Sequence, residues 1–415
     1  MKIGFVTQWY DPELGSAALP GIISRSLSRR GQDVEVLTGF PNYPSGTLYP
    51  GYRVRPYKRE VIDGVVVHRA PLFPSHDTRA LSRVTNYLSF GSGATAVALT
   101  RLPRMDAVLV HGTPATAAAP AMALKRLRGT PFVFHVQDLW PDTVISSGFL
   151  KPDRSRRVES ALHRFCDAIY RAAHAVAVTS PSMAERIAAR GVPEAKIHFV
   201  PNWADEQSFT PVVGDAVTAS RLGATRPFTV MYAGIFGEFQ ALDALVEAAA
   251  LLRNRRDIGF ALVGGGVAED RLRARVAELE LDNVSFAPMQ PFSEMAAVLA
   301  AGNVQVISLQ DRPLSNRTLP SKLQGTLSAG RPIIGALAGD AAAVVRESGA
   351  GPVVTPGSST ELADATIRLA DAPREEVAGL GRRAHEYYLD NFSEEVSAGR
   401  LLDLLSEASV QRGRR

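Results

Sequence analysis

The chain has 415 residues, of which 46% are hydrophobic and 21% charged, and it carries a net charge of +4 with a pI of about 9.2. This length exceeds what one hydrophobic core usually supports, so two domains are expected. The absence of an apolar run of about eighteen residues excludes a transmembrane helix. A single cysteine, Cys166, excludes an internal disulfide and a cysteine-based zinc site, and it fits a reducing cytoplasm. Without Cys/His clusters or long basic tracts, nucleic acid is not an expected partner.

The first half of the chain alternates short β-branched runs with segments of helical spacing. Strands are predicted at residues 2–7, 33–38, 65–70, 107–111, 131–136, 174–179 and 197–200. The first intervening helix has Ile23 and Leu27 on one face and ends at Gly31, the residue type favoured just past a helix C-terminus. Such alternation is typical of a parallel sheet covered by helices on both faces.

A polar stretch without a clear period, 201–227, precedes a second alternation. Strands are predicted there at residues 228–233, 259–264, 283–287, 304–309, 332–337 and 352–355, and helices at 382–392 and 398–407. We therefore predict an α/β protein of two facing Rossmann-like, doubly wound domains with an interdomain cleft. The domains are predicted at 1–205, completed by C-terminal helices at about 390–415, and at 206–389. Neither has a G-x-G-x-x-G or P-loop motif after its first strand, which disfavours a dehydrogenase or a P-loop enzyme.

The loop after the first strand contains Gly15 and Ser16, which suit a tight turn with Ser16 as the N-cap of the next helix. Free N–H groups at such a helix start can bind a phosphate or stabilise a leaving oxyanion. A plain strand–turn–helix junction explains the same residues, so both interpretations stay open. The second domain is richer in glycine at its strand ends, where a ligand can approach the backbone closely. Donor binding is predicted at these positions, namely Gly234, Gly237, Gly264, Gly265 and Gly266.

The segment 318–332 predicts a short helix with Pro320 at its first position and Gly330 just past its end. The helix dipole and the free N–H groups that follow Pro320, those of Ser321 and Lys322 among them, would face the predicted cleft, where Lys322 adds a full positive charge. This combination suits a diphosphate. The alternative is an ordinary surface lysine.

These pieces together resemble one family. They include Gln137-Asp138-Leu139-Trp140-Pro141, Pro201-Asn202 with Asp205 and Phe209, Tyr232-Ala233-Gly234, Gly264-Gly265-Gly266, Pro320-Ser321-Lys322 and Ala329-Gly330-Arg331-Pro332. In this order and spacing the chain resembles the retaining glycosyltransferases of family 4, which have the GT-B fold. The branch is the bacterial one that builds surface polysaccharides and decorates natural products.

The resemblance implies transfer of a sugar from a nucleoside-diphosphate sugar with retention of configuration, without a bound metal or a cofactor. The acceptor, held by the N-terminal domain, would be a sugar, a lipid-linked molecule or a small molecule. The family is argued to react on one face of the sugar, with the leaving phosphate helping to deprotonate the acceptor. A cytoplasmic protein is expected, with weak contact with the inner membrane face kept open. The helix predicted at 153–173 is rich in Arg and has an apolar face, so it would either meet that surface or be an ordinary solvated helix.

Three departures from the family pattern matter. Relatives often have His where Gln137 stands, so Asp138 and His135 become the candidates for catalytic contacts near the sugar, together with Lys322. The alternative for Asp138 and His135 is a structural role at the edge of the core, since a histidine near a strand end often only satisfies its own hydrogen bonds. Relatives often have Arg and Lys after the Gly234 loop. Here Glu238 and Gln240 lie there instead, leaving Lys322 with Arg312 or Arg317 to supply positive charge.

The third departure is Gly325, which stands where the family's helix carries a Glu that binds both ribose hydroxyls. Gln324 is rotated by about 100° on a helix, so it is an imperfect substitute. Either an unusual donor is read elsewhere, with Gly325 making room for it, or the donor site is altered or lost and the chain is a non-catalytic partner or a nucleotide-sugar epimerase.

The remaining site residues are assigned by loop position. Base recognition is expected from the backbone near Met289 and Gln290, and Ser321 and Arg317 complete the donor set. Acceptor binding is expected from Trp9, Gln137 and Trp140, with ordinary packing as the alternative for the tryptophans.

Overall fold

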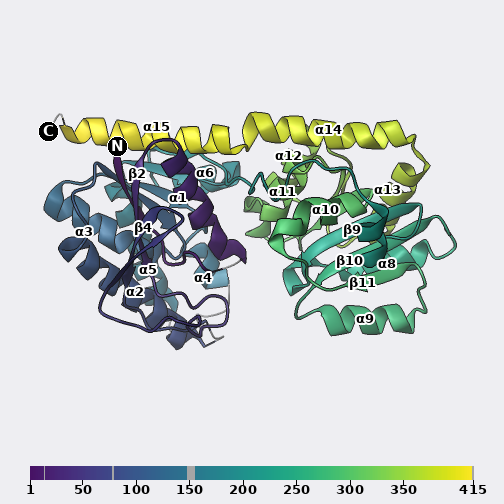
Figure 1. Cartoon of the computed structure of the whole chain (residues 1–415), viewed down its shortest axis with the longest axis horizontal. Helices are drawn as coiled ribbons and strands as arrows, with labels where there is room; N and C mark the ends of the chain where they lie inside the picture. Colours follow the sequence, from purple (N-terminus) through teal and green to yellow (C-terminus); the bar gives the residue numbers. More distant parts are fainter. Residues whose placement is uncertain (14, 77–78, 147–154, 414–415) are drawn as a thin grey trace. The chain divides into compact units, whose positions relative to one another are not determined.

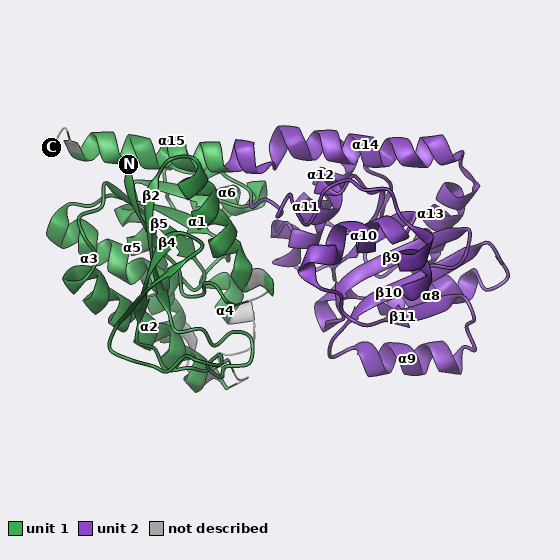
Figure 2. Ribbon diagram, in the orientation of Figure 1, with its two compact units in different colours: residues 1–201, 398–415 green, residues 202–397 purple. Residues whose placement is uncertain are grey.

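The computed structural model describes residues 1–13, 15–76, 79–146 and 155–413, and the chain divides into two compact units (Figure 1, Figure 2). Unit 1 consists of residues 1–201 and 398–415, and unit 2 of residues 202–397. The predicted division assigns residues 202–205 to the first domain and ends the second at 389. Among the described residues, no helix combines the length and apolar character needed to cross a membrane.

Unit 1 is built on an eight-stranded sheet in the order β3-β4-β2-β1-β5-β6-β7-β8. Its strands are β1 (Lys2–Val6), β2 (Asp33–Gly39), β3 (Lys58–Ile62), β4 (Val65–Ala70), β5 (Ala107–Gly112), β6 (Phe132–Val136), β7 (Ala175–Val178) and β8 (Ile197–Phe199). Seven of them are the predicted strands, shifted by no more than two residues. The sheet is parallel except for β3, which the sequence did not predict and which pairs antiparallel with β4 at the sheet edge.

The helices of unit 1 are α1 (Leu19–Arg29), α2 (Ala80–Thr100), α3 (Ala118–Arg128), α4 (Asp142–Ser146), α5 (Ser155–Ala172), α6 (Pro181–Ala188) and most of α15 (Glu394–Gly413), with short 3-10 turns η1 (Gly15–Ala18), η2 (Ala115–Ala117) and η4 (Glu194–Lys196). Helix α1 buries Ile23 and Leu27, and Gly31 follows it at φ 78°, as predicted. Ser16 lies inside η1, so it is not the N-cap of α1, a position that Ala18 takes.

Helix α5 turns its apolar face to the core of unit 1. Cys166, Ile169 and Tyr170 are fully covered and belong to the main hydrophobic cluster, and Phe165 packs against it. This packing accounts for the C-terminal part of the apolar stripe predicted at 153–173, while Val158 near the start of α5 is 44% exposed. Residues 153 and 154 of that prediction lie outside the described residues.

Unit 2 has a six-stranded parallel sheet in the order β11-β10-β9-β12-β13-β14. Its strands are β9 (Phe228–Ile235), β10 (Ile258–Gly265), β11 (Val284–Ala287), β12 (Val304–Ser308), β13 (Ile333–Ala336) and β14 (Val353–Val354), which are the six predicted ones. Its helices are α7 (Ala216–Arg221), α8 (Asp243–Leu251), α9 (Glu269–Glu278), α10 (Met295–Ala301), α11 (Ser321–Ser328), α12 (Gly339–Glu347), α13 (Ser359–Asp371) and α14 (Arg374–Asn391), with 3-10 turns η5 (Glu238–Gln240), η6 (Phe292–Glu294) and η7 (Ser315–Arg317).

The strand orders place a topological switch point in each sheet. In unit 1 the chain adds β2 and β4 on one side of β1 and then continues with β5 on its other side. In unit 2 it adds β10 and β11 on one side of β9 and then continues with β12 on the other side. Ligands of open α/β sheets bind outside the carboxyl ends of the strands at such points. The loops after β1 and β5, and those after β9 and β12, are therefore where a site is expected.

Candidate active site

The loops that follow β9 and β12 meet at the switch point of unit 2. The backbone N–H of Gln310 donates to the carbonyl of Phe239 at 2.8 Å, and its side-chain amide donates to the carbonyl of Glu238 at 2.7 Å. The Arg312 guanidinium lies 4.9 Å from the centre of the Phe239 ring. These contacts hold the two loops against each other beside the glycine-rich ends of β9 and β10.

The glycines at the ends of β9 and β10 allow two backbones to approach closely. Gly264 has φ 150°, and a Cβ built there would overlap the carbonyl oxygen of Gly234. Gly266 also has φ 150°, and its Cβ would lie 2.6 Å from the carbonyl oxygen of Phe236. The Phe236 N–H in turn donates to the Gly265 carbonyl at 2.8 Å. This packing requires glycine, so the triple glycine has a structural reason whether or not a ligand also uses it.

Helix α11 begins at Ser321, one residue later than predicted. Pro320 is its N-cap, at φ −68° and ψ 138°, and no side chain caps this helix end. Ser321 is exposed, while residues 323–328 are buried. The uncapped helix start therefore offers an anion its dipole and backbone N–H groups.

Lys322 lies over Gly234. A Cβ on Gly234 would come within 2.6 Å of the Lys322 ammonium nitrogen, so the side chain occupies the space that this glycine leaves open. The ammonium lies 3.6 Å from the centre of the Tyr232 ring and donates a hydrogen bond to the Tyr232 hydroxyl. Among the described residues, no carboxylate lies within ion-pair distance of it. Burial without an opposing charge lowers the pKa of Lys322 to about 7.

Replacing Lys322 with methionine is expected to stabilise the fold at pH 7. The shift in pKa from 10.5 to about 7 corresponds to roughly 4–5 kcal/mol at most, and partial exposure reduces this to about 2 kcal/mol. Because the folded pKa lies below the unfolded one, the unfolded chain binds more protons between these values, and wild-type stability rises with pH across that window. Urea unfolding of both proteins between pH 7 and pH 10 should therefore show the advantage of Lys322→Met shrinking as pH rises.

Lys58→Met is the matched control, since it removes a surface cation that is already paired with Glu60. It should bring no stabilisation at pH 7. Equal free energies of unfolding for wild type and Lys322→Met at pH 7 would show that burial of the Lys322 ammonium does not destabilise the fold.

Position 325 has no room for a side chain. A Cβ on Gly325 would lie 2.7 Å from Cε1 and 2.8 Å from Cδ1 of Phe209. The Phe209 ring contacts that of Phe292 edge to face at 5.3 Å, and the Phe209 carbonyl accepts a hydrogen bond from Ser328 at 2.8 Å. Gln324 is only 3% exposed. Phe209 therefore fills the place where the resemblance implies a carboxylate, and the expectation that Gly325 makes room for a donor is wrong in this structure, because the ring occupies that space.

The other predicted donor residues lie at or near the same strand ends. Gly237 is the N-cap of η5, and Arg317 is half-buried at the end of η7. Met289 is 57% exposed in the loop after β11. The Gln290 side chain accepts a hydrogen bond from Arg221 and donates to the Pro288 carbonyl at 2.6 Å. In unit 1, Gly15 is exposed at φ 71° in the loop after β1.

In unit 1 the two predicted catalytic candidates occupy different environments. Asp138 follows β6, is partly exposed and accepts a hydrogen bond from Thr113 at 2.9 Å, and burial raises its pKa. His135 has 0% exposure inside β6 and bonds through Nε2 to the Val200 carbonyl at 3.0 Å. Burial lowers the pKa of His135 to about 4. A side chain so covered touches no ligand in this conformation, so its surroundings indicate a structural role.

The predicted acceptor residues also differ in surroundings. The half-buried Trp9 packs on Tyr43 at 5.2 Å and on His76 at 6.4 Å between ring centres. Trp140 packs on Tyr87 at 5.7 Å and against the hydrophobic core, as the packing alternative predicts. The Gln137 amide lies 3.3 Å from Nδ1 of His135.

Glu13 was missed by the sequence reasoning although it organises this part of unit 1. Its buried carboxyl accepts hydrogen bonds from the backbone N–H groups of Tyr10 at 2.9 Å and of Asn42 and Tyr43 at 2.7 Å each. Burial raises the pKa of Glu13 to about 7. The residue joins the loops after β1 and β2 and so positions the Trp9–Tyr43 pair. A single acidic residue in a loop carries no periodic signal from which this role could be predicted.

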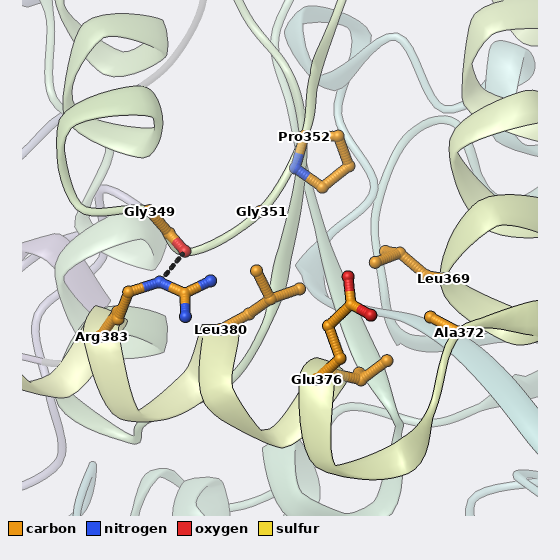
Figure 3. A pocket seen from close by; sticks show the side chains of 9 residues that line it. Gly349, Gly351, Pro352, Leu369, Ala372, Glu376, Leu380 and Arg383 are labelled. Atoms are coloured by element: carbon orange, nitrogen blue, oxygen red, sulfur yellow. Dashed lines mark hydrogen bonds between the residues drawn. The ribbon is translucent and has the colours of Figure 1, made fainter.

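Two cavities lie away from these loops. One, of about 310 Å³, is lined by Gly349, Pro352, Glu376 and Arg383 among others, and Arg383 donates to the Gly349 carbonyl at 3.2 Å (Figure 3). It adjoins the amino end of β14. The other, also of about 310 Å³, contains His174, Lys196, His198 and Glu407 at the amino ends of β7 and β8. Each cavity lies at the amino ends of strands of its own unit's sheet, whereas the glycine loops of unit 2 follow the carboxyl ends of β9 and β10. Among the described residues, no group of three or more His, Cys, Asp or Glu side chains is arranged to hold a metal ion.

Comparison with known proteins agrees with this architecture. The family model described as "Glycosyl transferase 4-like domain" matches residues 22–203, and that described as "Glycosyl transferases group 1" matches residues 227–372. The chain is 29% identical over 326 residues, 77% of its length and 79% of the other protein, to the colanic acid biosynthesis glycosyl transferase WcaI of Escherichia coli (strain K12).

Solved structures share the fold over nearly the whole chain. Sucrose-phosphate synthase from Thermosynechococcus elongatus superposes with a TM-score of 0.74 at 20% identity, covering 98% of both chains. Anabaena HepE in complex with UDP-glucose superposes with a TM-score of 0.68 at 17% identity, covering 98% of this chain and 100% of that one. The chain therefore belongs to the family 4 glycosyltransferases with the GT-B fold and is a glycosyltransferase.

Proposed function

We propose that the protein transfers a glycosyl group from a nucleoside-diphosphate sugar to an acceptor with retention of configuration and without a protein-bound metal ion. The observation that carries this proposal is Lys322, a partly buried ammonium beside Gly234 at an uncapped helix start, with no described carboxylate within ion-pair distance. A diphosphate supplies the missing negative charge. Unit 2 then binds the donor, and unit 1 binds a sugar, lipid-linked or small-molecule acceptor.

The proposed chemistry takes place on one face of the sugar. The bond from the anomeric carbon to the β-phosphate oxygen breaks, and the acceptor oxygen bonds to that carbon from the same side. The acceptor proton passes to the departing phosphate, which leaves as a nucleoside diphosphate. Lys322 and the N–H groups at the start of α11 stabilise the charge that develops on the leaving group. Asp138, with its raised pKa, is proposed as a polar contact near the sugar.

Two further observations support the donor class. The HepE structure, which has the same fold, contains UDP-glucose. In this chain the glycine-lined ends of β9 and β10 and the start of α11 lie together through the contact between Gly234 and Lys322. The covered position 325 keeps open the second candidate, a GT-B protein whose donor site is changed or lost, acting as a partner or as an epimerase.

Thermal unfolding with millimolar UDP, GDP, ADP, CDP and dTDP tests the proposal. One nucleotide should raise the melting temperature, because a ligand at a hundred times its Kd adds about 2.7 kcal/mol to stability. Lys322→Ala should lose most of this shift, while Lys196→Ala, a change at the amino end of β8 in unit 1, should keep it. No shift with any nucleotide would favour the lost donor site. Conversion of a donor without an acceptor would favour the epimerase.

A further inference from the structure

Phe209 and Gly325 form a contact on the same face of α11 as Lys322. Gly325 is three residues after Lys322, which places it about one turn along the same side of the helix. The Phe209 ring lies directly over it, with Cε1 2.7 Å from where a Cβ would be. The Phe209 carbonyl accepts a hydrogen bond from Ser328 of α11 at 2.8 Å, which holds the Phe209 backbone beside this helix. The helix thus presents an aromatic surface one turn beyond the ammonium.

The two carboxylates on the turn that carries Phe209 already accept hydrogen bonds from protein groups. Asp205 accepts a hydrogen bond from the Ser208 hydroxyl at 2.8 Å. Glu206 accepts from the Tyr388 hydroxyl at 3.1 Å and from the Glu394 N–H at 2.7 Å. Both carboxylates are therefore bonded to protein groups, Asp205 within its own turn and Glu206 toward α14 and α15.

The same ring also touches the loop that follows β11. Phe292 in that loop contacts Phe209 at 5.3 Å and is 49% exposed, and Met289 in the same loop is 57% exposed. In a nucleoside diphosphate the ribose lies between the phosphates and the base. With the diphosphate at Lys322 and the base at the Met289 loop, the ribose comes to the surface formed by Phe209 over Gly325.

We propose that Phe209, covering Gly325, is the surface on which the donor's ribose lies, so that the enzyme accepts ribonucleotide and 2′-deoxyribonucleotide donors nearly equally. This inference rests on the proposed function. A site built to bond a hydroxyl rejects an analogue that lacks it by a large factor, because its own polar groups are left unpaired. An aromatic surface that holds the sugar by packing imposes no such loss when the 2′-hydroxyl is absent.

This proposal is tested by calorimetric titration of the wild-type protein with a ribonucleotide and its 2′-deoxy counterpart. The pair is UDP and 2′-deoxy-UDP, or the corresponding pair for whichever base stabilises the protein. The two Kd values should differ by less than fivefold. Phe209→Ala should weaken both ligands together and leave their ratio unchanged. Phe73→Ala, which removes an exposed phenylalanine of unit 1, is the control that should change neither Kd.

The double variant Phe209→Ala/Gly325→Glu removes the ring that fills the space beside position 325 and places a carboxylate there. It should bind the ribonucleotide at least tenfold more tightly than its deoxy counterpart, and equal binding by the double variant would show that the ribose does not lie here. A wild-type preference for the ribonucleotide above fivefold would overturn the inference but leave the proposed function standing. Failure to bind any nucleotide would overturn both.

Discussion

Lys322→Ala is expected to lower turnover by about 10²–10³-fold, the range found when one preorganised donor to a developing charge is removed. The ammonium is held beside Gly234 and the Tyr232 ring before any ligand arrives. The cost of holding it there, seen as a pKa lowered to about 7, is offset when a diphosphate binds. Steady-state kinetics with the donor identified by the nucleotide panel would measure the loss, which should fall mainly on kcat if the interaction strengthens as the leaving group departs.

Lys196→Ala provides the matched comparison. Lys196 is also a lysine whose pKa burial lowers, but it lies in the cavity at the amino ends of β7 and β8. Its removal should leave kcat and KM within a factor of about two of the wild-type values. If Lys322→Ala kept turnover within a few-fold of wild type, the role of Lys322 in stabilising the leaving group would be wrong.

Gly264→Ala should destabilise the protein by about 3 kcal/mol or more, a magnitude reserved for severe backbone conflicts. The new Cβ would overlap the Gly234 carbonyl oxygen and lie 2.8 Å from its carbonyl carbon, at a φ of 150° that L residues rarely adopt. Both neighbours are backbone atoms, so no rotamer change relieves the overlap. Relaxation must displace the β9 loop that faces Lys322, and nucleotide binding should weaken as well. Urea unfolding and calorimetry measure the two effects.

Gly357→Ala separates the free-energy cost of a positive φ from the cost of steric overlap with neighbouring backbone. Gly357 also has positive φ, at 80°, but a Cβ there meets nothing within 4 Å. The strain of that backbone region alone should cost about 1 kcal/mol. Similar losses of stability in the two variants would mean that the contact between the β9 and β10 loops contributes little.

Much of the fold follows from local pattern. The apolar runs at β1, β5 and β9 are almost fully buried on both faces, and such strands are recognised as continuous β-branched segments without tertiary information. Strand β3 was missed because its Lys58-Arg59-Glu60 start is charged and lies at the sheet edge, where it pairs with β4 in an antiparallel hairpin. An edge strand exposed on one side lacks the buried run on which the prediction depended.

The candidate site was only partly predictable. The sequence placed glycines and Lys322 near strand ends, but it assigned the triple glycine to a ligand, whereas Gly264 and Gly266 are also required by neighbouring backbone. It left His135 open between catalysis and a structural role, because a histidine on a strand can face core or solvent, and here the side chain is fully buried against the Val200 carbonyl. Glu13 gave no signal because its three partners come from two different loops.

The sequence by itself determined the alternation of strands and helices, the two parallel sheets and the membership of the glycosyltransferase family, since each depends on local pattern or on motifs in order. Only the tertiary structure decided the chemistry at individual positions. Phe209 and Gly325 are distant in sequence yet in contact, and the pKa of Lys322 depends on Tyr232 and Gly234 on another strand. Burial, electrostatic environment and available space arise from such long-range contacts, so no window of sequence contains them.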